Sequence, residues 1–313
     1  MIKMEEILCS IRNYTKFSGG DISLYSLAGA ALECGLDVIF VTDKNIYLQG
    51  HDQYYYKDGR KLLFIFGEEL SDPVRKDVPR YISLGIEKEQ FNRRISAPQN
   101  EIRIFIEPEE NGSFIKYLEI INSEEILNRG LDASQKKIRE RMKFFDGLQA
   151  RDYRCTGIVG TCLSAERHSF GPKEILSTAF NHVFIDEPLT GDFIHDKMTV
   201  YKALRSGRVF MAVDGLSDAK GFRFTAEGDN RERVAYPGDT IFLKSSITFK
   251  ISAPEACVCR LIRDGKPVKE WQQCRQVPYT IYEPGCYRVE CALPRRKELY
   301  DWIFTNPIYA VKG

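Results

Sequence analysis

The sequence predicts an α/β domain with a largely parallel sheet or barrel, followed by a smaller all-β sandwich. Apolar runs of strand length alternate with helical patterns up to about residue 212. From there to the end, short alternating runs are bounded by turn residues, and helical signals are weak. The pattern changes at Asp214–Asp218, a stretch of turn-forming residues. We therefore expect an α/β domain at residues 1–214 and a β-sandwich at residues 217–313.

The elements of the first domain follow from apolar spacing. After a strand at Ile7–Ile11, a helix is indicated by one apolar face, formed by Leu24, Leu27, Ala28, Ala31 and Leu32. Asp21 or Ser23 can cap this helix, and Gly35 ends it. Further strands are expected at Val38–Val41, Leu62–Phe66, Ile102–Ile106, Tyr117–Ile121, Thr156–Val159 and Val209–Ala212. Further helices are expected at Ser134–Phe145, Pro172–Phe180 and Asp196–Ser206.

The second domain reads as a series of short strands, which is typical of an Ig-like sandwich. Asp264-Gly265 between two such strands is a hairpin signal, because Asp-Gly supplies the turn. The expected strands are Phe222–Ala226, Thr240–Leu243, Ile247–Ser252, Val258–Arg263, Val268–Trp271, Tyr279–Tyr282, Tyr287–Leu293 and Ile308–Val311.

Composition narrows the class of function. The chain has 45 Lys+Arg against 44 Asp+Glu, so no overall field would draw it to nucleic acid or to an acidic membrane. The N-terminus lacks an apolar stretch long enough for a signal peptide, and no segment approaches a membrane span. These features predict a cytoplasmic protein that binds neither nucleic acid nor membrane. They do not indicate an oligomeric state.

The chain has nine cysteines, five of them in the last sixty residues: Cys257, Cys259, Cys274, Cys286 and Cys291. A zinc site or a disulfide is one interpretation of this group. No CxxC spacing occurs, however, and Cys257 and Cys259 alternate as a strand would place them on one face. In a reducing compartment we expect small apolar fillers within strands.

Several motifs occur in a recognisable order along the chain. SIRNYT (10–15) and FSGG (17–20) precede the first helix, and VTDKN (41–45) and FIFGEEL (64–70) follow it. YKALRSGRVFM (201–211) and DWIFTNPIYA (301–310) come later. This order resembles that of the PHP (polymerase and histidinol phosphatase) superfamily, in particular its predicted metal-dependent phosphoesterases with a C-terminal β-sandwich. The resemblance spans nearly the whole chain.

The resemblance implies a distorted (β/α)7 barrel that holds two or three divalent metals at the ends of its strands. There the metals would activate water for hydrolysis of a phosphate ester. The sequence departs from the family at most ligand positions. The two opening histidines fall on Arg12 and Tyr14, the aspartate of a Ser-Asp-Gly turn falls on Gly19, and the histidine of Thr-Asp-His falls on Lys44. Asp43 and Glu69 match the family.

Looser matches continue this series of replacements. Two further family histidines fall on Arg80 and Glu107, and a late Asp-x-His falls on Cys162 and Ser164. None of the chain's four histidines, His51, His168, His182 and His195, occupies a carried-over position. Charged Lys and Arg side chains cannot coordinate a metal and would repel one. The sequence thus predicts no metal cofactor. If a metal such as Zn, Mn or Fe is held, the remaining candidates are Glu69, Glu107, Cys162 and His168.

Three functions remain open from the sequence. The residues could form a salt-bridge network in an inactive scaffold, where Arg12, Lys44 and Arg80 meet the leftover carboxylates. The same three cations could instead grip a small anionic ligand, such as a phosphate or carboxylate. A divergent phosphoesterase with a rearranged site is the remaining alternative, and Cys162 as a nucleophile is less favoured because no basic partner has a diagnostic spacing. A protein partner would suit the scaffold.

Overall fold

The computed structural model describes residues 4–18, 22–71, 80–87, 101–106, 115–151, 153–163, 170–228, 234–295 and 298–313. Within these residues, strands dominate: one sheet has 14 strands and a second has five. Five α-helices accompany them there: α1 (Leu24–Glu33), α2 (Ser123–Arg129), α3 (Leu131–Gln149), α4 (Pro172–Leu176) and α5 (Phe193–Arg205). None of the described helices is long and apolar enough to cross a lipid bilayer.

The large sheet runs through the whole molecule. Its main path is β13 (Val234–Ala235), β12 (Arg223–Gly228), β15 (Ile247–Arg263), β17 (Gly285–Arg295), β18 (Glu298–Thr305), β11 (Val209–Ala212), β10 (Phe180–Ile185), β1 (Glu5–Asn13), β2 (Val38–Val41), β4 (Arg60–Phe66) and β3 (Gln53–Lys57). Off this path, β16 (Lys266–Ile281) pairs with β15, and β19 (Ile308–Lys312) pairs with β17 and with β14 (Thr240–Leu243).

The small sheet has the order β5 (Glu68–Leu70), β6 (Tyr81–Leu84), β7 (Ile102–Phe105), β8 (Tyr117–Asn122) and β9 (Thr156–Gly160). Two isolated parallel bridges connect it to segments of the large sheet, Asn13–Leu163 and Lys44–Glu69. The amide of Thr161 also donates to the carbonyl of Ile11 at 2.7 Å. Residues at the ends of β1, β2 and β9 are therefore held close to β5.

The expected α/β fold is wrong, both as a largely parallel sheet and as a (β/α)7 barrel, because strands dominate the described residues and many of them pair antiparallel. A barrel of that class needs parallel strands joined by helical crossovers, but β3 and β4 form an antiparallel hairpin and β10 pairs antiparallel with both β1 and β11. In the small sheet, β6 is antiparallel to both of its neighbours. The sequence pattern located many of the strands but did not reveal their directions, and it missed others: β3, β5, β6, β10, β13 and β18.

Many of the expected elements are confirmed. β2 and β11 have the expected bounds, and Ser23 caps α1, with its side chain accepting from the amide of Ser26 at 3.1 Å. The expected helix Pro172–Phe180 is too long, because α4 ends at Leu176 and Phe180 begins the unpredicted strand β10. In the C-terminal part, pairs of expected short strands merge into the long strands β15 and β16.

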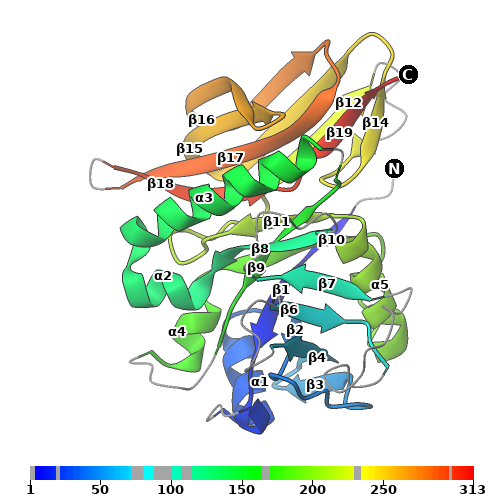
Figure 1. Cartoon of the computed structure of the whole chain (residues 1–313), viewed down its shortest axis with the longest axis vertical. Helices are drawn as coiled ribbons and strands as arrows, with labels where there is room; N and C mark the ends of the chain where they lie inside the picture. The colour runs from blue at the N-terminus through cyan, green and yellow to red at the C-terminus, as the bar shows by residue number, and fades with distance from the viewer. Residues whose placement is uncertain are drawn as a thin grey trace.

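The C-terminal strands gather at one end of the molecule, where α3 lies along them (Figure 1). The large sheet continues from one part into the other through the pairing of β11 with β18, in which Phe210 faces Thr305. A bidentate ion pair adds a second link: Arg288 of β17 donates from Nε and Nη2 to Asp146 of α3, both at 2.8 Å. A division between residues 214 and 217 stays a prediction.

His182 lies in β10, next to β11, and its side chain is fully buried. Its Nδ1 lies 2.8 Å from Glu6 of β1, and its Nε2 lies 3.2 Å from Asp214. The ring stacks on Phe210 at a centroid distance of 4.3 Å. Burial alone would lower the pKa of His182, but the two carboxylates outweigh it and raise the pKa. The imidazolium form is therefore the stabilised one.

We expect stability to fall as pH rises through the raised pKa of His182. The stabilisation is fully present below the unfolded-state pKa, about 6.5, and is lost above the folded-state value. Urea unfolding from about pH 5 to about pH 9 should show His182→Gln costing less stability as pH rises. His51→Gln, at an exposed position, is the control. A cost that stays constant across this range would show that folding does not change the pKa of His182.

Candidate functional site

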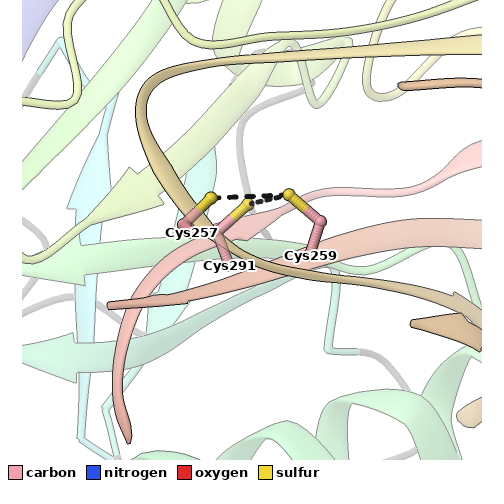
Figure 2. Close-up of side chains that lie close together, drawn as sticks. All are labelled: Cys257, Cys259 and Cys291. Carbon is pink, nitrogen blue, oxygen red and sulfur yellow. Dashed lines mark hydrogen bonds between the residues drawn. The ribbon is translucent and has the colours of Figure 1, made fainter. Parts of the chain in front are cut away.

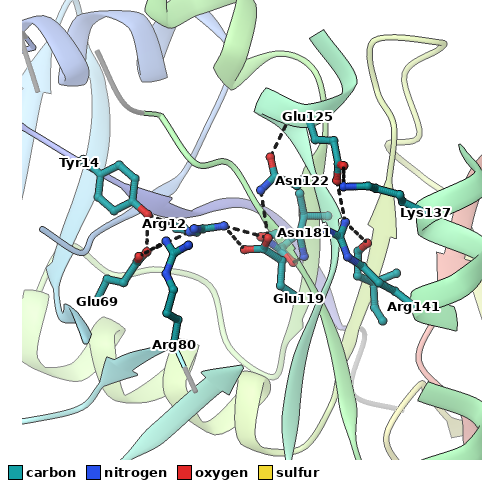
Figure 3. Close-up of polar contacts among 12 residues, drawn as sticks. Arg12, Tyr14, Glu69, Arg80, Glu119, Asn122, Glu125, Lys137, Arg141 and Asn181 are labelled. Carbon is teal, nitrogen blue, oxygen red and sulfur yellow. Dashed lines mark hydrogen bonds and ion pairs between the residues drawn. The ribbon is translucent and has the colours of Figure 1, made fainter. Parts of the chain in front are cut away.

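Four of the residues singled out in the sequence meet in one buried polar cluster: Arg12, Tyr14, Glu69 and Arg80 (Figure 3). Arg12 lies in β1 and Glu69 in β5, while Arg80 directly precedes β6. The cluster therefore sits where the two sheets are bridged. We refer to these four residues together with Glu119 of β8 as the polar cluster.

Arg12 is the centre of the polar cluster and is only 3% exposed. Its Nε donates to Glu69 at 3.0 Å, and its Nη1 donates to both oxygens of Glu119, at 2.9 and 3.0 Å. The backbone of Arg12 has φ 72°, in the left-handed region that side chains rarely adopt. The register between β1 and β2 shifts at this point. The strand is thus locally irregular where it turns its guanidinium between two carboxylates.

Glu69 is fully buried and accepts from three side chains. Its Oε1 accepts from Nη2 of Arg80 at 2.7 Å, and its Oε2 accepts from Arg12 and from the hydroxyl of Tyr14. Burial raises the pKa of Glu69, but Arg12 and Arg80 outweigh that effect and hold the pKa below its usual range. Burial also raises the pKa of Tyr14 well above its usual value, so its hydroxyl stays a neutral donor.

Glu119 is the second buried carboxylate of the polar cluster and is 1% exposed. Burial raises its pKa, although Arg12 and Arg141 act in the opposite direction. The side-chain amide of Asn122 donates from Nδ2 to Oε1 of Glu119 at 3.0 Å. Its Oδ1 accepts from the backbone amide of Glu125 and so caps α2. A Cβ on Gly160 of β9 would lie 1.9 Å from Glu119 Oε2. Glycine is therefore required there for Glu119 to reach Arg12.

Arg12 supplies the positive charge that balances the two carboxylates of the polar cluster. Burial alone would lower its pKa, but the attraction of Glu119 and the other neighbouring groups raises the pKa well above the usual value. A permanently charged guanidinium thus stands between two buried carboxylates. Removing it would leave both anions without their main partner.

Lys44 and Asp43 lie beside the polar cluster. The ammonium of Lys44 is 4.9 Å from the ring centroid of Tyr14, in a cation–π contact. Asp43 accepts from the amide and hydroxyl of Thr15, both at 2.7 Å, and from the hydroxyl of Ser18 at 2.5 Å. Asp43 therefore fixes the conformation of the loop after β1. None of its described hydrogen bonds involves Arg12 or Arg80.

Cys162 follows β9 and also has a positive φ, 55°. Burial raises the pKa of its thiol to about 12, and Arg12 offsets this only in part. The thiol is therefore protonated near neutral pH, which is unfavourable for a nucleophile. The other candidates, Gly19, Glu107, Ser164 and His168, lie outside the described residues.

Glu119 and Asn122 were missed by reasoning from the sequence. Both lie in β8; the strand was predicted as Tyr117–Ile121, one residue short of Asn122, and without regard to its single acidic residue. An acidic residue within an apolar strand is a signal in itself, because a buried carboxylate needs a cationic partner. That signal could have suggested an ion pair between Glu119 and one of the cations that stand at the family's ligand positions.

The donor set at the polar cluster does not fit a divalent metal centre. Each oxygen of Glu69 and Glu119 already accepts a hydrogen bond from an arginine. A metal would have to displace Arg12 and then bear the repulsion of Arg80 at close range. The described side chains instead define a buried ion-pair network at the junction of two β-sheets.

Comparisons with known proteins give little beyond this description. No family model matches the chain, and no curated protein matches it. A solved structure from Bacteroides vulgatus, described as a two-domain protein containing a predicted PHP-like metal-dependent phosphoesterase, aligns over 96% of this chain and 95% of its own. The TM-score is 0.46 and the sequence identity is 11%, so this similarity is weak.

Proposed function

We propose that the chain is a catalytically inactive PHP-like protein, in which the polar cluster replaces the family's metals and acts as a structural link. The observation that carries the proposal is the position of Arg12, buried between Glu69 and Glu119 and hydrogen-bonded to both. A guanidinium there supplies the positive charge that leftover carboxylates need. The order of motifs in the sequence supports the PHP-like part of the proposal.

The charges near the polar cluster favour a scaffold over an anion-binding site. Three cations, Arg12, Lys44 and Arg80, lie near three carboxylates, Asp43, Glu69 and Glu119. This balance leaves no excess positive charge to attract a phosphate. The side chain of Arg80 is 41% exposed, yet it already donates to Glu69. The protein would then act through its surface, as a scaffold for a partner.

A titration with Mn²⁺ tests the proposal, because Mn²⁺ prefers carboxylate ligands. We expect no shift in the thermal unfolding midpoint of the wild-type protein and no Mn²⁺-dependent hydrolysis of an aryl phosphate ester. Glu187→Gln, at a 63% exposed carboxylate, is the matched control for Glu69→Gln.

Two outcomes would contradict the proposal. Saturable stabilisation by Mn²⁺ together with hydrolysis, both lost in Glu69→Gln and kept in Glu187→Gln, would restore the phosphoesterase alternative. Stabilisation by inorganic phosphate that is lost in Arg80→Ala would instead show an anion-binding site.

A further inference from the structure

Four cysteines from three neighbouring strands lie on one face of the large sheet. Cys257 and Cys259 are two residues apart on β15, so their side chains point to the same face. Cys274 of β16 is the cross-strand partner of Cys257, and Cys291 of β17 is the partner of Cys259. Directly paired residues share a face, so all four side chains project from the same side of the sheet. We call Cys257, Cys259, Cys274 and Cys291 the thiol cluster.

The sulfur atoms are close enough to share one ion. Sγ of Cys259 lies 3.5 Å from Sγ of Cys257 and 3.5 Å from Sγ of Cys291 (Figure 2). All three sulfurs lie within 4.8 Å of one another, and the three residues are at most 1% exposed. A tetrahedral zinc ion with Zn–S bonds of about 2.3 Å separates its sulfur ligands by about 3.8 Å. The observed spacing is near that value.

Cys274 is the candidate for the fourth ligand, because its backbone lies opposite Cys257 and its carbonyl accepts from the Cys257 thiol at 3.8 Å. The sulfur of Cys274 lies outside the group of three sulfurs that are within 4.8 Å of one another, so its side chain must shift to complete a set of four ligands. Cys274 is only partly buried and lies in β16, whose described pairing is with β15 alone. Entry from solvent is therefore easiest on the side of Cys274.

The backbone beside Cys274 is irregular in a way that serves this arrangement. Between the pairs Cys257–Cys274 and Cys259–Trp271 the register shifts, because β16 holds one more residue than β15. The neighbouring Gln273 has φ 50°, in the left-handed region. Such strained positions persist where the surrounding structure requires them. Without this bulge, Cys274 and Trp271 could not both lie opposite Cys257 and Cys259 on the same face.

We propose that Cys257, Cys259, Cys274 and Cys291 form a structural tetrathiolate zinc site that ties β15, β16 and β17 together. Four thiolates are a common ligand set for structural zinc, and soft sulfur ligands favour zinc over Mg²⁺, Ca²⁺ or Mn²⁺. The sequence suggested apolar fillers because no CxxC spacing occurs; in a sheet, the ligands are brought together by strand pairing instead. This site is independent of the polar cluster and of the function proposed for it.

Elemental analysis and cobalt substitution test the proposal. Protein purified without chelators from zinc-supplemented cultures should hold about one equivalent of zinc. Zinc should fall below about a tenth of an equivalent in Cys259→Ser and in Cys274→Ser. Cys286→Ser is the matched control, since Cys286 lies on β17 outside the cluster and should leave the zinc content unchanged. Replacing zinc with Co²⁺ should give the near-ultraviolet charge-transfer absorption of thiolate–cobalt bonds.

Several results would overturn the proposal. Metal-free protein that takes up no Co²⁺ and titrates all nine thiols would show simple buried fillers. Two fewer titratable thiols in the unreduced, denatured chain would show a disulfide. Iron in place of zinc, or zinc retained in both serine variants, would also exclude the assignment. If Cys259→Ser fails to fold, the partly buried Cys274→Ser and the wild-type cobalt spectrum still decide.

Discussion

Arg12→Met should destabilise the protein by about 3–5 kcal/mol, because removing one partner of a buried ion pair leaves the other charge uncompensated. Met fills much of the volume of the arginine stem, so lost packing contributes little. The loss falls on Glu69 and Glu119, at most 1% exposed, each of which accepts a hydrogen bond from Arg12 at 3.0 Å or less. Urea unfolding followed by circular dichroism measures the change.

A double variant distinguishes loss of the ion pair from a general destabilisation caused by any substitution in β1. Adding Glu119→Gln to Arg12→Met removes one of the two stranded charges, so the double variant should recover at least about 1 kcal/mol. Lys173→Met is the control: this lysine pairs with a carboxylate, Glu33, and both side chains are exposed, 63% and 57%. It should cost about 1 kcal/mol or less. A similar small cost for Arg12→Met would mean that water reaches the polar cluster and that Arg12 does not hold it together.

The sequence predicted the members of the polar cluster better than it predicted the fold. Arg12, Tyr14, Glu69 and Arg80 were placed together because each stands at a position of one motif series, and the structure shows them in contact. The direction of a strand leaves no such trace in sequence. Phe180 was expected to end a helix and residues 181–185 were assigned to no element, yet FNHVFI (180–185) forms β10, the strand that pairs antiparallel with β1 and β11. Tertiary pairing overrides local pattern there.

The proximity of the cysteines in the thiol cluster could not be predicted from the sequence either. Cys274 and Cys291 are separated by 17 residues, and only the pairing of β16 and β17 with β15 brings them to Cys257 and Cys259. The bulge at Gln273 shifts the register by one residue, and a shift of one reverses which face a side chain occupies. Register of this kind depends on the folded sheet, so spacing along the chain could not reveal that these cysteines lie on one face of neighbouring strands.

Gly160→Ala should destabilise the protein by about 2–4 kcal/mol through the same polar cluster, since overpacking and a displaced charge act together. The added Cβ would lie 1.9 Å from Oε2 and 2.5 Å from Cδ of Glu119, closer than any real contact. Relief requires Glu119 to rotate away, and its two hydrogen bonds from Arg12 would then be lost. Because the strain is released by moving that carboxylate, the cost depends on Glu119.

A double-mutant cycle tests that dependence. In a Glu119→Ala background the obstructing carboxylate is gone, so Gly160→Ala should cost at least about 1 kcal/mol less than it does in the wild-type protein. Gly147→Ala provides the opposite control: Gly147 lies in α3, and a Cβ there meets nothing within 4 Å. Alanine in that helix should stabilise the protein by about 0.5–1 kcal/mol. Equal costs of Gly160→Ala in both backgrounds would show that β9 resists the substitution by itself and that Gly160 is not kept for Glu119.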